Sequence, residues 1–485
     1  MKILVLQLAR LGDIYMTWPA LRAIKRMHPN CELHFLTRSK FGAATEGLKV
    51  VDHHLQMPTK FFLEPLIQPT LDLEDAMKRL GTFVDALKAE EYDWVINYTF
   101  SPASSYLTHA ITGPKTRVTG YTRHSDGFLG IPDEVSAYFY AQAGVTGYNR
   151  VHLTDLFISM LGYDYVDSDW DPPQVDGRDF GLPEKFILAH IGASEAKKSL
   201  PPFKWARVLK NFFDHNLETP VVMIGAANER NLGEAIEAGV SRGRIINLIG
   251  QTQLREVFHL LKSAQMLVGC DSAPMHMAGL TNTPCLNISF DSVNFWETGP
   301  KATHSFIYKA SFPEDVVSEE LGAYMHQVLQ GKAPAELIQR SSGLESYQVP
   351  QEDPQELFTW NLVQALYLSG NFPVTDNLQF CQAISKIYEV NDLARQNIRQ
   401  IPDKGLEVMA PLLDRADEVI AAVARVMPSV APIVKWYQTE KARIPAGSQE
   451  EVAQWTLEVH EKLQRILSVY MLEDSIKAHE SNFKE

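Results

Sequence analysis

The N-terminal segment constrains the fold more than any other part of the chain. Met1-Lys-Ile-Leu-Val-Leu-Gln-Leu is a run of apolar residues typical of a buried strand, and a short turn ending in Gly12-Asp13 follows it. The amphipathic stretch from Ile14 to His28 then predicts a helix. A buried strand that enters a helix through a short glycine turn opens a doubly wound α/β domain, in which ligands bind beyond the carboxyl ends of the strands. Asp13 is therefore expected at a ligand-binding edge, where the dipole of the helix favours its ionised form.

Strand-like and helix-like patterns alternate from this segment to about residue 330. Strands are expected at 3–8, 32–37, 52–56, 94–98, 117–121, 186–190, 220–224, 245–248, 266–269 and 285–290. Helices are expected at 14–28, 73–90, 104–111, 149–161, 202–216, 230–238, 254–263, 274–281 and 315–330. An acidic, proline-containing stretch at 164–179 interrupts the alternation and is interpreted as an interdomain linker. Two α/β halves with a ligand-binding cleft between them are therefore predicted.

The character of the sequence changes after about residue 335. Helical patterns with few strand signals occupy 355–368, 378–399, 406–427, 433–442 and 450–479, which predicts an antiparallel helical bundle. The expected domains are a Rossmann-like domain at 1–165, a linker at 166–182, a second Rossmann-like domain at 183–335 and a helical extension at 350–485.

Composition excludes several classes of protein. A formal net charge of -14 argues against a general nucleic-acid binder, because phosphate backbones are held by clustered lysines and arginines. The four cysteines include no Cys-x-x-Cys pair, so neither a disulfide framework nor a zinc site is expected. No stretch approaches the roughly 18 apolar residues of a membrane-spanning helix, so a cytoplasmic protein is expected.

Two loops of the second half have residues suited to binding an anion. The loop at 190–201 combines small residues with Ser194 and Lys198, and the turn at 269–279 brings Asp271 and Ser272 to the start of a helix. Free amides at such positions, a hydroxyl and a lysine can hold phosphate groups. Simpler roles also fit these residues: Lys198 as a surface lysine, Asp271 or Ser272 as a helix N-cap and His276 as a core histidine. Asp13 itself also suits a helix N-cap.

Taken together, these motifs resemble family-nine glycosyltransferases, which include the lipopolysaccharide heptosyltransferases. The resemblance covers about residues 1–330 and rests on Met1-Lys-Ile-Leu, Leu11-Gly-Asp13, Pro19-Ala-Leu-Arg-Ala-Ile-Lys, Lys198 and Pro201 with Trp205, Asp271-Ser-Ala-Pro-Met-His276-Met-Ala and Gly299-Pro300. It implies the GT-B fold of two Rossmann-like domains, the first on the acceptor side and the second binding the nucleotide sugar. It also implies a nucleotide-diphosphate sugar donor such as ADP-heptose, inversion at the anomeric carbon, and an active site with no metal or cofactor.

The resemblance also assigns roles to individual residues. Asp13 is similar to the general base that removes a proton from the acceptor hydroxyl, and Lys198 is expected to assist the reaction as well as bind the donor. Arg117 and Arg123, which belong to a basic cluster that also fits a solvated face, are expected to bind the acceptor. The expected donor-binding residues are Ser194, Lys198, Glu229, Asp271, Ser272, Ala273 and His276.

The acceptor side departs from the family pattern. Residues 95–102 lack the Asp-Leu-Gln-type signature common in heptosyltransferases, and the insertion at 57–75 is longer than expected. The predicted function is therefore sugar transfer to a lipopolysaccharide core or a related cell-surface glycan, at the inner membrane surface, with the acceptor left open. Two alternatives are a sugar-nucleotide epimerase and a non-catalytic protein that binds nucleotide sugars or docks a partner. A dehydrogenase is not expected, because residues 7–12 lack Gly-x-Gly-x-x-Gly.

Overall fold

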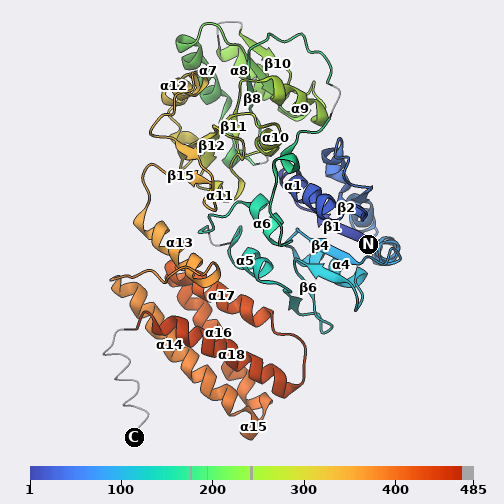
Figure 1. Cartoon of the computed structure of the whole chain (residues 1–485), viewed down its shortest axis with the longest axis vertical. Coiled ribbons are helices and arrows are strands. Elements are labelled where there is room, and N and C mark those ends of the chain that lie inside the picture. Colours follow the sequence, from blue (N-terminus) through green and yellow to red (C-terminus); the bar gives the residue numbers. More distant parts are fainter. Residues whose placement is uncertain (146, 175–176, 194, 241–243, 472–485) are drawn as a thin grey trace. The chain divides into compact units, whose positions relative to one another are not determined.

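The computed structural model describes residues 1–145, 147–174, 177–193, 195–240 and 244–471 (Figure 1). The chain packs as two units. The first comprises Met1–Thr99, Ile111–Arg117 and Arg150–Gln351, and the second comprises Phe100–Ala110, Val118–Asn149 and the region from Glu352 onward. Two segments of the first third of the chain thus pack with the C-terminal helices. The domain boundaries drawn from the sequence stay a prediction.

The first sheet of the first unit is built on the N-terminal strand. Its order is β3-β2-β1-β4-β5, with β1 (Lys2–Gln7), β2 (Glu32–Arg38), β3 (His53–Met57), β4 (Trp94–Asn97) and β5 (Arg117–Thr119). The pairs β1–β2, β1–β4 and β2–β3 are parallel, and β1 is buried from Ile3 to Gln7, as its continuous apolar pattern predicts. The helical elements of this half are α1 (Leu11–Met27), η1 (Ser39–Thr45), α2 (Thr59–Leu63), η2 (Glu64–Leu66), α3 (Leu73–Lys88), α6 (Leu153–Ser159) and η3 (Asp167–Trp170).

The second sheet has the order β10-β9-β8-β11-β12-β13-β14-β15. Its strands are β8 (Ile187–His190), β9 (Val221–Ile224), β10 (Ile245–Asn247), β11 (Met266–Cys270), β12 (Cys285–Phe290), β13 (Phe306–Ala310), β14 (Ile338–Arg340) and β15 (Tyr347–Gln348). The helical elements are η4 (Ala196–Lys198), α7 (Pro202–His215), η5 (Ala227–Glu229), α8 (Arg230–Gly239), α9 (Leu254–Ser263), α10 (Ala273–Thr281), α11 (Phe295–Thr298), η6 (Pro313–Asp315) and α12 (Ser318–Leu329). The pairs from β10 to β13 are parallel, and β14 and β15 add an antiparallel edge that the sequence patterns did not predict.

Helix α1 joins the two halves of the first unit. The ring of Trp18 stacks on Phe258 of α9, with centroids 5.6 Å apart, and Tyr15 meets the same ring edge-on at 5.4 Å. Arg26 forms an ion pair of 2.8 Å with Asp169, whose side chain is only 2% exposed. The segment interpreted as an interdomain linker therefore has a buried anchor, the carboxylate of Asp169, which pairs with a helix arginine.

The second unit is mainly helical. Its elements are α4 (Pro102–Ile111), β6 (Thr122–Arg123), β7 (Leu129–Gly130), α5 (Glu134–Gln142), α13 (Pro354–Tyr367), α14 (Leu378–Arg399), α15 (Ile401–Lys404), α16 (Leu406–Val426), η7 (Pro428–Val430), α17 (Ala431–Ala442) and α18 (Gln449–Ser468). The apolar faces of α14, α16, α17 and α18 share one core, as the predicted bundle requires. Helix α5 packs against α17, and Glu134 pairs with Arg443 at 2.8 Å. None of the helices in the described part of the chain combines the length and the apolar character needed to cross a bilayer.

Candidate active site

Asp13 lies in the first turn of α1 and closes a capping box. Arg10 occupies the N-cap, and its backbone amide donates a hydrogen bond of 2.9 Å to Oδ2 of Asp13. Asp13 is the third helical residue, so it caps the helix from this position and not from the N-cap position considered for it. Burial raises the pKa of the Asp13 carboxyl, against the opposing effects of the Arg10 amide and of His276. A carboxylate has about four lone-pair sites. The one hydrogen bond from the Arg10 amide therefore leaves the Asp13 carboxylate able to accept a proton.

His276 of α10 lies directly against the turn that carries Asp13. A Cβ atom built on Gly12 would lie 2.6 Å from Cδ2 and 3.0 Å from Nε2 of this histidine. Burial lowers the pKa of the His276 imidazole, while the carboxylates of Asp271 and Asp13 act to raise it. The imidazole is therefore neutral near pH 7. It interacts electrostatically with the carboxylates of Asp271 and Asp13.

Asp271 and Lys198 form an ion pair in the second α/β half. Nζ of Lys198 lies 3.5 Å from Oδ2 of Asp271, and both side chains are largely buried. Thr298 donates a hydrogen bond of 3.1 Å from its Oγ1 to the other oxygen of Asp271, which fixes the carboxylate from the opposite side. The lysine loop after β8 and the turn after β11 are thereby brought together, as the sequence predicts for a phosphate site. Ser194 of the same loop lies outside the described residues.

Ser272 occupies the N-cap of α10, but its side chain makes no capping hydrogen bond. Its hydroxyl instead donates to the backbone oxygen of Cys270 and lies 3.0 Å from Nδ1 of His190. Ala273 follows as the first helical residue. Amides in the first turn of a helix have no partner within the helix, so this turn can donate hydrogen bonds to an anion.

Glu229 lies across the loops that follow β8 and β9. Its Oε2 accepts a hydrogen bond of 2.6 Å from the amide of Ala226. A Cβ atom on Gly192 would fall 1.8 Å from Oε1, and one on Gly225 would fall 2.6 Å from Oε2, so a larger residue at either position would displace this carboxylate. A carboxylate held at the carboxyl ends of adjacent parallel strands is suited to the hydroxyls of a ribose.

One link between the two halves was missed in the sequence. Arg10 of the opening turn forms an ion pair of 3.2 Å with Glu195 of the lysine loop, and Lys197 pairs with the same carboxylate. The opening turn therefore faces the loop that carries Lys198. Arg10 stands between the apolar strand and Gly12, and a cation in a strand-to-helix turn is the signal that could have identified it.

The two arginines expected to bind the acceptor belong to different units. Arg117 is exposed at the start of β5 in the first unit, and its guanidinium lies 3.9 Å from the centroid of the Trp94 ring. Arg123 belongs to the second unit, where it donates to Ser105 and lies 4.2 Å from the centroid of the Tyr106 ring. Their acceptor role stays a prediction.

Comparison with known proteins places this site in a family context. Residues 80–305 match the sequence model of glycosyltransferase family 9 (heptosyltransferase). The chain is 24% identical over 311 residues to lipopolysaccharide heptosyltransferase 1 of Campylobacter coli, covering 59% of this chain and 83% of that protein. It is 18% identical over 282 residues to lipopolysaccharide heptosyltransferase 3 of Escherichia coli strain K12, covering 57% of this chain and 79% of that protein.

Solved structures agree with the fold. The glycosyl transferase family 9 structure from Veillonella parvula superposes with a TM-score of 0.53 at 17% identity, covering 68% of this chain and 98% of the other. The structure of E. coli heptosyltransferase WaaC with ADP superposes with a TM-score of 0.50 at 14% identity, covering 68% of this chain and 100% of the other. The expected GT-B fold, two Rossmann-like sheets with a helical C-terminal region, is thereby confirmed.

Proposed function

Because residues 80–305 match the model of glycosyltransferase family 9 (heptosyltransferase), we propose that this chain transfers heptose from ADP-heptose with inversion. The proposed acceptor is a lipopolysaccharide core or a related cell-surface glycan. Such an acceptor is membrane-borne, so the enzyme would work as a peripheral protein at the inner membrane surface. The observation that carries the proposal is the approach of the Asp13 turn to His276 and, through Asp271, to Lys198.

The donor side supplies charge for the departing diphosphate. Lys198 contributes a positive charge, and the first-turn amides of α10, beginning with Ala273, contribute oriented N–H dipoles. Negative charge grows on the diphosphate as the anomeric bond breaks, so these groups bind the transition state more tightly than the intact donor. They would do so without a metal in the transfer site. Glu229 would hold the ribose and set the position of the diphosphate.

The acceptor side supplies the base. Asp13 takes the proton from an acceptor hydroxyl while that oxygen attacks the anomeric carbon and the bond to the diphosphate breaks. The pKa of Asp13, raised by burial, makes the carboxylate a stronger base than an ordinary aspartate. Attack from the face opposite the leaving diphosphate inverts the anomeric centre.

The test is a donor panel. The purified protein is incubated with a set of nucleotide sugars, with and without lipopolysaccharide-core acceptors, and release of nucleoside diphosphate is measured. We expect ADP release from ADP-heptose that depends on the acceptor, and a product of inverted anomeric configuration. Conversion of a nucleotide sugar without acceptor would instead indicate an epimerase, and no binding of any donor would indicate a non-catalytic protein.

A further inference from the structure

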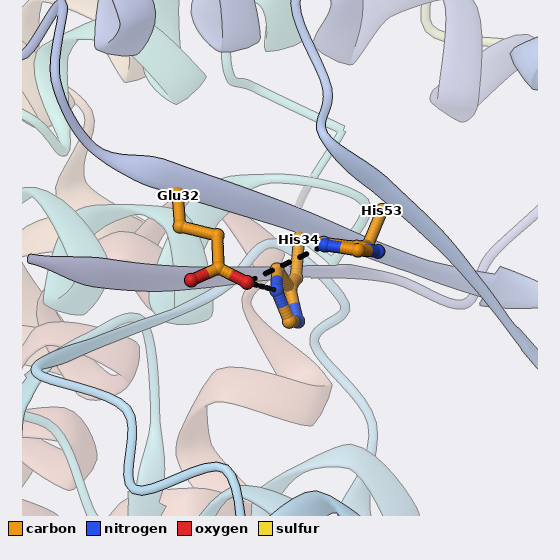
Figure 2. Close-up of side chains that lie close together, drawn as sticks. All are labelled: Glu32, His34 and His53. Carbon is orange, nitrogen blue, oxygen red and sulfur yellow. Dashed lines mark hydrogen bonds and ion pairs between the residues drawn. The ribbon is translucent and has the colours of Figure 1, made fainter.

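Three metal-ligating side chains meet at the amino end of the first sheet. Glu32 and His34 are alternate residues of β2, so their side chains point to the same face. His53 of β3 lies directly opposite His34 in the parallel register. Figure 2 shows the three side chains converging on one point. Glu32 pairs with Lys2, whereas the transfer site follows Gln7, so the cluster lies about 17 Å along the strands from that edge.

The spacing of the three side chains suits a tetrahedral metal. Oε1 of Glu32 lies 3.0 Å from Nε2 of His34 and 3.4 Å from Nε2 of His53. One ligand atom from each residue can be chosen so that all three lie within 4.8 Å of one another. Ligands bound tetrahedrally to zinc at about 2.0–2.1 Å are separated by about 3.3 Å, so small side-chain adjustments would complete the geometry.

His34 is already oriented as a ligand. It is 4% exposed, and its Nδ1 lies 2.9 Å from the hydroxyl of Tyr92, which leaves Nε2 directed toward Glu32. Metal-binding histidines characteristically use their second nitrogen for a hydrogen bond of this kind, because it selects the tautomer and fixes the ring. The Tyr92 ring also meets the His34 ring edge-on, at 5.3 Å between centroids.

From this geometry we propose that Glu32, His34 and His53 bind one Zn²⁺ ion, with water as the fourth ligand. Two imidazoles and one carboxylate are a donor set that zinc accepts, whereas magnesium and calcium prefer oxygen ligands. The side chains of Glu32 and His53 are 45% and 57% exposed, so the fourth position is open to solvent. The neighbouring cation, Lys2, is held by Glu90 at 2.7 Å. The metal would fasten the edge strand β3 to β2, a role separate from sugar transfer.

The test measures zinc binding directly. The full-length protein, with any affinity tag removed, is treated with chelator, dialysed and titrated with Zn²⁺ by calorimetry, and bound zinc is counted by elemental analysis. We expect about one zinc per chain, and a visible spectrum of tetrahedral cobalt when Co²⁺ replaces zinc. Glu32→Gln and His53→Asn should weaken binding more than about tenfold, and Tyr92→Phe by about 10–100-fold.

His54→Asn is the matched control, because this exposed neighbour points to the other face of the same strand. It should leave zinc affinity unchanged within about twofold. Circular dichroism of each zinc-free variant establishes that the fold is retained. Absence of zinc binding by the folded wild-type protein, or equal losses in His53→Asn and His54→Asn, would show that the three residues form only a hydrogen-bonded cluster.

Discussion

A Cβ atom on Gly12 would lie 2.6 Å from Cδ2 of His276, so the residue before the candidate base touches the imidazole of the other α/β half. Gly12 lies within α1, and its φ angle is not among the positive ones. Backbone conformation therefore does not require glycine at this position. The contact with His276 favours glycine instead, because a Cβ atom at this position would have to displace the ring.

Gly12→Ala should lower the free energy of unfolding by about 1–3 kcal/mol through this overlap, despite the better helix propensity of alanine. In a His276→Ala background the same change should be neutral or stabilising, because the clashing ring is gone. Gly81→Ala in α3 is the control, since nothing lies within 4 Å of its added Cβ, and it should stabilise. Chemical denaturation of the four variants measures the coupling, and equal effects of Gly12→Ala in both backgrounds would refute the contact.

Asp13→Asn should reduce kcat by about 10²–10⁴-fold, the usual contribution of a general base, and leave ADP affinity nearly unchanged. Asparagine keeps an oxygen that can accept the Arg10 amide, so the start of the helix should survive. A variant with normal kcat would exclude Asp13 as the base.

As the pH is lowered, kcat/KM of the wild-type enzyme should begin to fall with a midpoint above pH 3.8, the ordinary pKa of an aspartate, because burial raises the pKa of Asp13. The base acts only when deprotonated, so kcat/KM should fall as the pH drops through this raised value. Measuring kcat/KM from neutral to acidic pH tests this, and His276→Gln controls for the neighbouring imidazole. A midpoint at or below pH 3.8 would contradict the argument that burial raises the pKa of Asp13.

Lys198→Gln should weaken ADP binding by about tenfold or more, because a hydrogen bond to a charged group contributes about 1.5–3 kcal/mol. The rate should fall as well, since the charge is needed more as the diphosphate departs. Lys197→Gln is the matched control: this neighbour is exposed and pairs only at the surface with Glu195. Calorimetry with ADP compares them, and equal losses in the two variants would remove Lys198 from the donor site.

Local patterns were enough to predict most of the strands that build the two sheets. The apolar runs of β1, β8, β9 and β11 are buried on both faces, and such runs identify parallel strands without knowledge of the partners. The parallel strand β13 and the antiparallel edge strands β14 and β15 were missed, because the pairing of such short strands depends on contacts distant in sequence rather than on periodicity.

Of the functional residues, local sequence located only those that follow a strand. Asp13, Lys198 and Asp271 each follow a strand, so the rule that ligands bind at carboxyl ends locates them. Cysteine spacing carries no information about the cluster of Glu32, His34 and His53, because the register between two strands brings His53 to His34. The packing of α5 on α17 likewise joins segments about 300 residues apart, and no local pattern encodes it.

The last prediction concerns the stability of the helical unit at acidic pH. His460 is buried, its Nδ1 lies 2.7 Å from Oδ1 of Asn391, and burial lowers its pKa from 6.5 to about 4. A lowered histidine pKa means that the unfolded chain binds the proton first, so stability is complete above pH 6.5 and falls as the pH drops toward 4. The loss should reach about 3 kcal/mol, at 1.36 kcal/mol per pKa unit.

Hydrogen exchange of the α14 and α18 amides between pH 6.5 and 4 measures this loss of stability in the full chain, and His460→Gln should make the stability less dependent on pH. His259→Gln, in the first unit, is the control and should leave the exchange of these amides unchanged. If the wild-type protein showed as little pH dependence as His460→Gln, then His460 would not control the stability of the bundle.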